Sequence, residues 1–327
     1  MNRYQEQCSK DRRASGAIRH QLRDDRGFVL IVILMIMAIL IPAVIVFSAK
    51  TQINVLQAAN FRDTVQAVRM ARSGVEGAMG ILANDDATYD TLKDTWAMDF
   101  PQLSVAGGGL SVKIVDEDSK ININRLVNNG TEINADVDRQ LRSLIRRLGG
   151  KEEIVDALID WMDANSDVTG AYGAEDEYYK KTGLLPKNGL LDSLDEIFLV
   201  RGFDKDLLVD KGLKYYITVA DTGKDGKINV NTAPIEVLSV ISDKLSEGRV
   251  EEIVRHRMEK EYKNINDVIS TIGIGPTEQQ EVQKYMKVNS TVFTVTSKFR
   301  IGKVVKTVEA VLKRADKTTS VVSWRES

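Results

Sequence analysis

One uninterrupted apolar run near the N-terminus dominates the hydrophobic pattern. Phe28 to Phe47 gives 20 residues without a charge, and a helix of about 20 apolar residues crosses about 30 Å of hydrocarbon. A secretory signal has an apolar region of only about 7–15 residues, so this run is too long to be one. Apolar residues then recur at spacings of three and four as far as Leu82. The pattern therefore predicts one continuous helix over residues 28–84.

Two later stretches repeat one pattern. LSVKIVDEDSKININRL (110–126) and YYITVADTGKDGKINVNTAP (215–234) each give a strand, an acidic turn, Lys-Ile-Asn-apolar-Asn and the start of a helix. We call them the Lys-Ile-Asn repeats. Their last asparagines, Asn124 and Asn231, stand where a side chain can cap the next helix, and capping is the role we predict for both.

Helical spacing covers most of the sequence between and after these repeats. The pattern predicts helices over residues 134–148, 151–164, 191–200 and 204–212, and further helices within 233–287. Two runs of strand alternation about an Ile-Gly-Lys turn follow. We expect residues 316–327 to form a flexible tail. The fold class predicted is therefore α+β.

Composition argues against most enzyme classes. Cys8 is the single cysteine, and His20 and His256 are the two histidines, so disulfides, thiolate clusters and the usual zinc sites are not expected. The formal net charge of −2 gives no general reason to expect a nucleic-acid partner. The glycines of VAGGGL (105–110) precede a strand rather than open a helix, unlike those of a dinucleotide loop. We expect a protein that is not an enzyme.

The segment between the repeats holds the densest group of metal-ligating side chains. Its glycines, Gly170 and Gly173, let the chain turn between two acidic groups. Calcium takes 6–8 oxygen ligands from flexible loops of this kind, although the spacing is not that of an EF-hand. The alternatives are a solvated acidic loop and, much less favoured, a catalytic pair of carboxylates. The predicted ligands are Asp160, Asp163, Asn165, Asp167, Glu175, Asp176 and Glu177.

The residues just before the apolar run change its interpretation. Residues 1–27 carry seven Lys/Arg and four Asp/Glu, which favours a cytoplasmic N-terminus for an ordinary anchor. The boundary Arg26-Gly27-Phe28 resembles a type IV prepilin signal, in which a membrane peptidase cuts after the glycine and the new terminal Phe is methylated. Gly27 and Phe28 are thus the predicted processing residues. Pilins have Glu at the fifth mature position, where this chain has Val32.

Taken together, these motifs resemble the minor pseudopilin K family of the type II secretion system. The resemblance rests on Gly27-Phe28, KININ, DWMDAN, GAEDEYY and INVNTAP, and it covers residues 24–314. It implies a leader (1–27), a transmembrane and spine helix (28–84), a pilin-like core (85–124 and 288–315) and an inserted helical domain (125–287). It also implies a calcium cofactor bound in the inserted domain.

The same resemblance implies a function and a location. A family member would stand at the tip of the periplasmic pseudopilus, anchored in the bacterial inner membrane before assembly. Its implied partners are the minor pseudopilins I and J, other pseudopilins, the inner-membrane assembly platform and the prepilin peptidase. Val32 fits a tip position, because a carboxylate in the membrane is costly unless it has a partner, and a leading subunit has no neighbour ahead.

A rival interpretation concerns residues 228–287, which resemble a helix-hairpin-helix module of competence DNA receptors. The segment IGIGP (272–276) fits the Gly-rich hairpin of such modules, but SDKLSEG (242–248) does not. Acidic residues alternate with the basic ones between 247 and 261, a balance that is wrong for phosphate binding. A membrane-anchored DNA-binding protein is therefore the alternative that we expect less.

Overall fold

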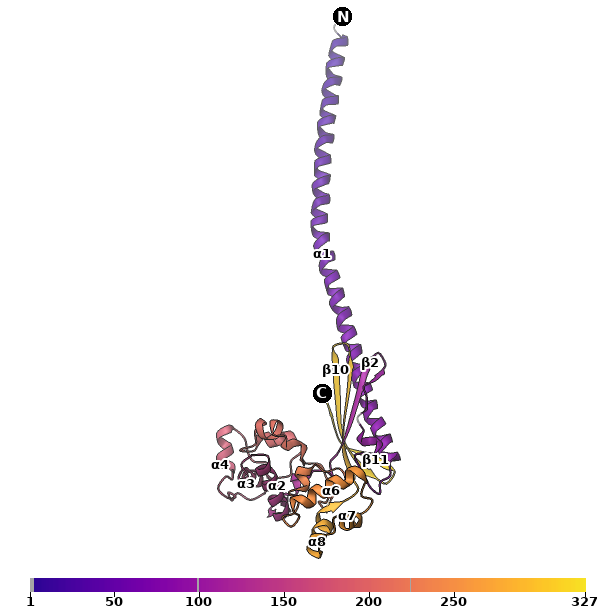
Figure 1. Ribbon diagram of the computed structural model, residues 1–327. Helices are drawn as coiled ribbons and strands as arrows, with labels where there is room; N and C mark the ends of the chain where they lie inside the picture. The colour runs from indigo at the N-terminus through magenta and orange to yellow at the C-terminus, as the bar shows by residue number, and fades with distance from the viewer. Residues whose placement is uncertain (1–2, 99, 224) are drawn as a thin grey trace. The chain divides into compact units, whose positions relative to one another are not determined.

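The computed structural model describes residues 3–98, 100–223 and 225–327, and only the backbone of residues 3–26 and Thr182. A long helix, an antiparallel sheet and a large set of further helices make up the fold (Figure 1). The chain divides into two compact units, Met1–Val65 and Gln66–Ser327. The predicted α+β class is confirmed.

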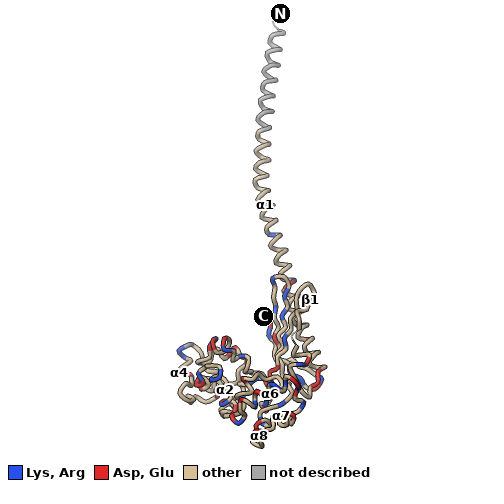
Figure 2. The backbone as a smooth tube through the Cα atoms, viewed as in Figure 1, with Lys and Arg blue, Asp and Glu red and all other residues tan. Residues whose placement is uncertain are grey.

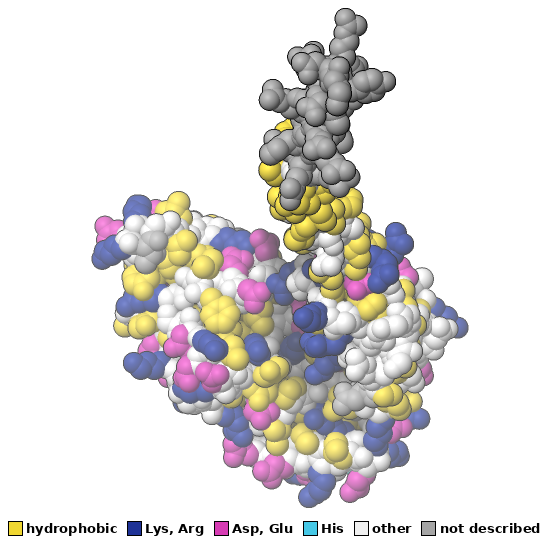
Figure 3. Space-filling view, turned by 90° about the horizontal axis from the view of Figure 1, so that it is seen from above, with side chains coloured by type: hydrophobic (Ala, Val, Ile, Leu, Met, Phe, Trp, Pro, Cys, Tyr) yellow, Lys and Arg dark blue, Asp and Glu magenta, His cyan; other side chains and the backbone are white. Residues whose placement is uncertain are grey.

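Helix α1 (Arg3–Asn84) includes the predicted span and continues through Pro42. Its segment from Gly27 onward passes the length and hydropathy test for a membrane-crossing helix. Side chains of the apolar run are exposed, for example Phe28 at 68% and Phe47 at 72%, and they cover the helix directly below the grey residues in Figure 3. Such a surface is stable in lipid or against other helices, but not in water.

A five-stranded antiparallel sheet forms the core of the second unit. Its strands, in spatial order, are β1 (Leu103–Val105), β2 (Gly108–Asp116), β9 (Val292–Ile301), β10 (Val304–Ala315) and β11 (Thr318–Glu326).

Strand β11 shows that the predicted flexible tail was wrong. Residues 318–326 pair with β10, and Ala315 lies opposite Thr318 across a two-residue turn. Asp316 supplies the positive φ of 51° that such tight hairpins need. The Thr, Val and Trp residues after it are good strand formers, so the local sequence favours pairing once β10 offers an edge.

The second half of α1 packs on one face of this sheet. Small residues at Ala67, Ala71 and Ala78 let the helix approach Phe293 and Phe299 closely in one buried cluster. A Cβ at Gly74 would collide with Ser297 Oγ, so a larger residue there would force the Ser297 side chain to move. This is the spine-on-sheet arrangement that the sequence predicted.

The remaining elements lie between β2 and β9 in sequence, with η1 (Thr95–Ala97) before them. Their apolar side chains form a second core that extends from Ile121 to Val288. In chain order they are β3 (Ile121–Asn122), η2 (Ile123–Arg125), β4 (Val127–Asn128), β5 (Glu132–Ile133), α2 (Ala135–Arg147), α3 (Ile154–Met162), α4 (Asp176–Tyr179), η3 (Lys180–Thr182), η4 (Leu194–Leu199), η5 (Asp206–Asp210), η6 (Leu213–Tyr215), β6 (Ile217–Thr218), β7 (Ile228–Asn229), α5 (Ile235–Leu238), α6 (Glu247–Glu259), α7 (Ile265–Ile272), α8 (Pro276–Tyr285) and β8 (Met286–Lys287).

Most of the predicted helices are confirmed. The patterns at 134–148 and 151–164 form α2 and α3, and 233–287 contains α5 to α8. The segment predicted as a helix over 191–200 forms only the short 3-10 helix η4, and that over 204–212 forms the π-helical turn η5.

Within each repeat, the Lys-Ile-Asn sequence itself begins a small unit that a parallel strand pair closes. β3 pairs with β6, and β7 pairs with β8. In the first unit the Asn124 amide donates to the carbonyls of Leu191 and Val219, both at 2.9 Å, and accepts from the Leu191 N–H at 2.8 Å.

The second Lys-Ile-Asn unit, which begins at β7, repeats these contacts. The Asn231 amide donates to the carbonyls of Tyr262 (2.9 Å) and Val288 (3.4 Å) and accepts from the Tyr262 N–H (3.0 Å). The prediction that Asn124 and Asn231 cap helices was therefore wrong. Both satisfy buried backbone groups of distant segments, and an asparagine can do so because it carries a donor and an acceptor together.

A buried polar network joins the sheet to these units. Asp116, at the end of β2, accepts from the hydroxyls of Thr232 (2.5 Å) and Ser290 (2.6 Å). Beside it, the Arg314 guanidinium at the end of β10 donates to Asp90 at 2.5 Å, with both side chains almost fully buried. Burial is the larger effect on the pKa of Asp90 and Arg314 opposes it, so that the pKa is raised to about 6. Breaking one partner would leave a charge without compensation in the core.

Replacing Arg314 with Met should destabilise the second unit by about 3–5 kcal/mol, because Asp90 would stay buried without its partner. Urea unfolding of the detergent-solubilised chain, followed by tryptophan fluorescence, measures the loss. Arg325→Met is the control: this side chain is 59% exposed and pairs with Asp195 and Glu309, so its loss should cost below about 1 kcal/mol. Equal losses in both variants would contradict the role of the buried pair.

Candidate metal centre

The acidic loop begins inside α3 and ends at the start of α4. Asp160 lies in the last turn of α3, and Asp163 follows as its C-cap residue. The two positions are three residues apart, which places their side chains on one side of the helix. Glu175 precedes the first residue of α4. The loop thus returns one carboxylate to the end of the helix that carries the other two.

These three carboxylates are buried. Their residues are exposed by only 0% (Asp160), 2% (Asp163) and 7% (Glu175). One oxygen of each, Asp160 Oδ2, Asp163 Oδ1 and Glu175 Oε1, is buried and has no hydrogen-bond partner. Native proteins rarely leave such atoms unpaired, so each demands an explanation. The three carboxylates also interact electrostatically, because the charges of Asp160 and Asp163 both act on Glu175.

The pKa values of the three buried carboxylates are all raised. Burial, followed by the charges of Asp160 and Asp163, raises the pKa of Glu175 to about 7. Burial also raises the pKa of Asp160, and burial with the Asp160 charge raises that of Asp163. A bound cation would remove the repulsion that produces these shifts.

The two glycines of the loop have separate steric reasons. A Cβ at Gly173 would collide with Asp160 Oδ2 and the Thr169 carbonyl, and one at Gly170, where φ is +56°, would collide with Asp156 Oδ2. The backbone therefore approaches the carboxylates of α3 more closely than a side chain would permit. Thr169 N–H donates to Asp160 Oδ1 at 3.0 Å, which fixes that oxygen and leaves the other one free.

The other four predicted ligands lie outside the buried cluster. The Asn165 side chain accepts from the Asp167 N–H at 2.7 Å and so closes its own turn. Asp167 is exposed, although its charge contributes to the raised pKa of Asp163. Asp176, the first residue of α4, pairs with Lys180, the first residue of η3, at 3.4 Å. Glu177 is exposed.

Asp156, one helical turn before Asp160, is a further acidic residue of this site that is not among the predicted ligands. Its carboxylate accepts from Arg142 of α2 at 2.7 Å and from the Tyr172 N–H at 3.3 Å. Asp156 therefore positions the loop, with its charge balanced by arginine. The i, i+4 spacing from Asp160 was a signal that could have identified it.

The donor set of the cluster fits a hard cation. It consists of carboxylates with carbonyls beside them, without nitrogen or sulfur ligands in the described part of the loop, and oxygen-only sets suit calcium. Asp160, Asp163 and Glu175 would hold the ion. Because these three residues are buried, they do not behave as the solvated acidic loop that was the alternative.

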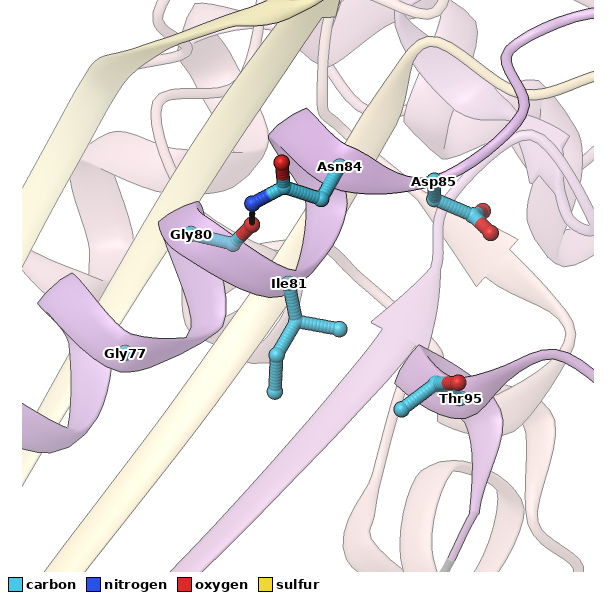
Figure 4. Close-up of a pocket in the computed structure, with 6 residues that line it drawn as sticks. All are labelled: Gly77, Gly80, Ile81, Asn84, Asp85 and Thr95. Atoms are coloured by element: carbon cyan, nitrogen blue, oxygen red, sulfur yellow. Dashed lines mark hydrogen bonds between the residues drawn. The ribbon is translucent and has the colours of Figure 1, made fainter.

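A second acidic group lies where α1 ends. Carboxylate oxygens of Asp85, Asp90 and Asp94 come within 4.8 Å of one another. Arg314 pairs with Asp85 (3.2 Å) and Asp90 and so balances one of the three charges, and Asp94 accepts from the Thr91 N–H at 2.6 Å. A cavity of about 400 Å³ opens beside it (Figure 4); its lining residues are Gly77, Gly80, Ile81, Asn84, Asp85 and Thr95.

The structure also shows where the predicted processing residues lie and how the hairpin at residues 272–276, which the DNA-binding alternative requires, is built. Gly27 and Phe28 lie within α1, exposed, at the start of the apolar run. In the hairpin, the Gly275 N–H donates to the Glu278 carboxylate at 3.1 Å, which places a negative charge where a phosphate would bind. Arg257 donates instead to the carbonyls of Val230 and Ala233. The DNA-binding alternative is therefore not favoured.

The Lys-Ile-Asn units coincide with known protein families. Two family models described as type II secretion system (T2SS), protein K, match residues 119–221 and 228–289, and together they match about half of the chain. The chain belongs to the type II secretion system protein K family. Each model begins near a Lys-Ile-Asn sequence and ends just past the strand that closes that unit, β6 or β8.

Relatives and a solved structure agree with this family. The type II secretion system protein K of Pseudomonas aeruginosa is 28% identical over 75% of this chain and 76% of its own. That of Klebsiella pneumoniae is 23% identical over 92% and 96%. In the crystal structure of the GspK-GspI-GspJ complex from enterotoxigenic Escherichia coli, a chain of 19% identity matches with a TM-score of 0.67, covering 83% of this chain and 99% of that one. The last match shows that the fold is shared.

The raised pKa of Glu175 predicts how stability depends on pH when a chelator is present. The folded pKa of about 7 lies above the ordinary 4.5, so the stability that Glu175 contributes is fully present below pH 4.5 and is lost as pH rises through 7, by on the order of 1–3 kcal/mol. Urea unfolding of the detergent-solubilised chain in EDTA at pH 4.5 and at pH 7.5 measures this loss. Glu175→Gln should reduce this loss and leave the part that comes from other buried carboxylates with raised pKa values, such as Asp90 and Asp116; Glu177→Gln should retain the loss in full. An unchanged pH dependence in Glu175→Gln would exclude Glu175 as its source.

Proposed function

We propose that this protein is the minor pseudopilin at the tip of a type II secretion pseudopilus. It is a non-catalytic assembly subunit that initiates the pseudopilus and helps to export folded proteins across the outer membrane. The observation that supports this most is the exposed apolar surface of α1, which begins directly at Gly27-Phe28 in a chain of the protein K family. An apolar helix that starts at a cleavage signal can serve first as an anchor and then as a fibre helix.

In this proposal a prepilin peptidase cuts after Gly27, and the new terminal Phe28 is methylated. The precursor lies in the bacterial inner membrane with its N-terminus in the cytoplasm and the second unit in the periplasm. The charged leader is removed while the apolar helix stays. The helix then leaves the bilayer and packs among the helices of other pseudopilins, where its exposed side chains are again shielded from water.

Val32 supports the tip position. In the mature count it is the fifth residue, where a buried carboxylate would need the amine of a preceding subunit as its partner. A subunit with no neighbour ahead is more stable with an apolar residue there. The proposed partners are therefore the subunits that follow: minor pseudopilins I and J, other pseudopilins and the inner-membrane assembly platform. The E. coli relative of similar fold was crystallised with GspI and GspJ, which supports the first two.

Calcium completes the proposal. An ion held by Asp160, Asp163 and Glu175 would supply the positive charge that their buried, unpaired oxygens require. By binding carboxylates from the end of α3 and the start of α4, it would fix the loop between them. Its role is structural, because it would stabilise the helical units that the subunit carries beyond its pilin-like core.

Replacing Gly27 with Leu should block cleavage, because a peptidase that cuts next to glycine needs space beside the scissile bond. Immunoblotting of the membrane fraction should show a precursor that is larger by the 27-residue leader, and secretion should stop. Val32→Ala, in the same helix but beyond the cut, should be processed normally. Normal cleavage of the Gly27→Leu variant would overturn the processing scheme.

Removing calcium should lower the melting temperature of the full chain in detergent. A ligand at 100 times its Kd stabilises by about 2.7 kcal/mol, which corresponds to about 5–10 °C for a unit of this size. Differential scanning fluorimetry with calcium and with EDTA measures the shift. Asp163→Ala should eliminate it, and Glu177→Gln, which changes an exposed carboxylate, should keep it. A melting temperature that EDTA leaves unchanged in the unaltered chain would exclude a calcium site.

A further inference from the structure

The sheet has a second face, turned away from α1, that is rich in cations. Lys298 and Arg300 of β9 and Lys113 of β2 alternate with the residues that pack against α1, and all three are exposed. Lys and Arg recur along these strands as blue segments in Figure 2. Within the part of the chain that the structure describes, none of the three forms an ion pair. We call them the basic sheet surface.

The pairing register places these three charges close together. Ser111 of β2 and Thr307 of β10 lie opposite Lys298, and Thr296 lies opposite Lys113. Neighbouring strands are about 4.8 Å apart, and diagonal residues are separated by about 7–8 Å. The basic sheet surface is thus a compact group of three cations interleaved with hydroxyl groups.

The other cations on this face already have carboxylate partners. Lys313 pairs with Asp221 at 3.2 Å, and Arg325 pairs with Asp195 at 2.8 Å and with Glu309 at 3.1 Å. Asp195 and Asp221 come from the helical part of the chain, so the sheet uses its cations to bind acidic residues of another segment. Glu309, the carboxylate on this face that lies diagonal to Lys298, is already paired with Arg325. The three cations of the basic sheet surface continue the same face without an ion-pair partner among the described residues.

The composition of the surface selects the kind of ligand. Single-stranded nucleic acids bind where aromatic side chains stack on their bases. The strand positions around these cations are instead Gly, Ser, Thr and Val, together with Glu309, which pairs with Arg325. Insertion into a lipid surface needs large apolar side chains beside the basic ones, which these positions also lack. A carboxylate-bearing protein segment needs only spaced cations and hydroxyl donors.

We propose that the basic sheet surface, formed by Lys113, Lys298 and Arg300, docks an acidic segment of a partner protein. The inference extends the proposed function without depending on it, since it requires neither a tip position nor calcium. Exposed charge pairs of this kind act mainly on specificity and on the rate of association. Binding should therefore be fast and strongly weakened by salt.

A fluorescent 12-residue oligoglutamate is the first probe. It is titrated against the full chain in detergent micelles, together with a triple variant that carries Lys113→Glu, Lys298→Glu and Arg300→Glu. The affinity should fall at least tenfold in that variant and should fall with added salt in the unaltered chain.

The matched control changes the same net charge at exposed lysines off the sheet: Lys151→Glu, Lys205→Glu and Lys260→Glu. It should keep the affinity within twofold. An equal fall in both variants, or no fall in the sheet variant, would overturn the proposal. Phosphatidylglycerol vesicles or duplex DNA that bind more tightly than oligoglutamate through the same three residues would also overturn it. Circular dichroism melts verify that each variant is folded.

A photo-cross-linking residue in place of Thr307, opposite Lys298, tests the surface in cells. Mass spectrometry should find adducts on protein segments that carry two or more Asp or Glu residues, and should not find them for the same cross-linker at Lys205. Adducts to lipid, or an adduct pattern equal to that of the control position, would contradict a docked acidic segment.

Discussion

The fold depends on one helix that meets two different environments. From Phe28 to Phe47 the side chains of α1 are apolar and exposed, a surface that only lipid or other apolar helices can cover. From Ala67 to Leu82 the same helix has small residues on the side that packs against the sheet. The first segment is long and apolar enough to cross a membrane, and the second packs on the sheet of the pilin-like core.

Buried polar groups then specify how the helical units are built. Asn124 and Asn231 make the same set of backbone contacts in the two successive Lys-Ile-Asn units. Asp116, Ser290 and Thr232 join the second Lys-Ile-Asn unit to the sheet. Such groups are costly unless every partner is present, so they favour one arrangement over others. Repetition of the contacts, rather than of the helices, is what the two Lys-Ile-Asn sequences encode.

Periodicity was sufficient to predict α1, α2, α3 and the last long strands, because each buries one regular face. It failed at residues 318–326, where pairing with β10 decided the outcome, and at Asn124 and Asn231, whose partners are distant in sequence. In the acidic loop, composition identified all three buried carboxylates, Asp160, Asp163 and Glu175, but it could not separate them from exposed neighbours such as Glu177. Burial and the role of Asp156 depend on how the loop folds back on α3, which spacing along the chain does not reveal.

The central claim is that α1 is a processed fibre helix rather than a permanent anchor. Mass spectrometry of the N-terminal peptide of the protein, isolated from membranes of secreting cells, tests it most directly. We expect a peptide that begins at Phe28 and carries one methyl group on its terminal amine. A mature protein that still begins at Met1, or at any residue before Gly27, would contradict it.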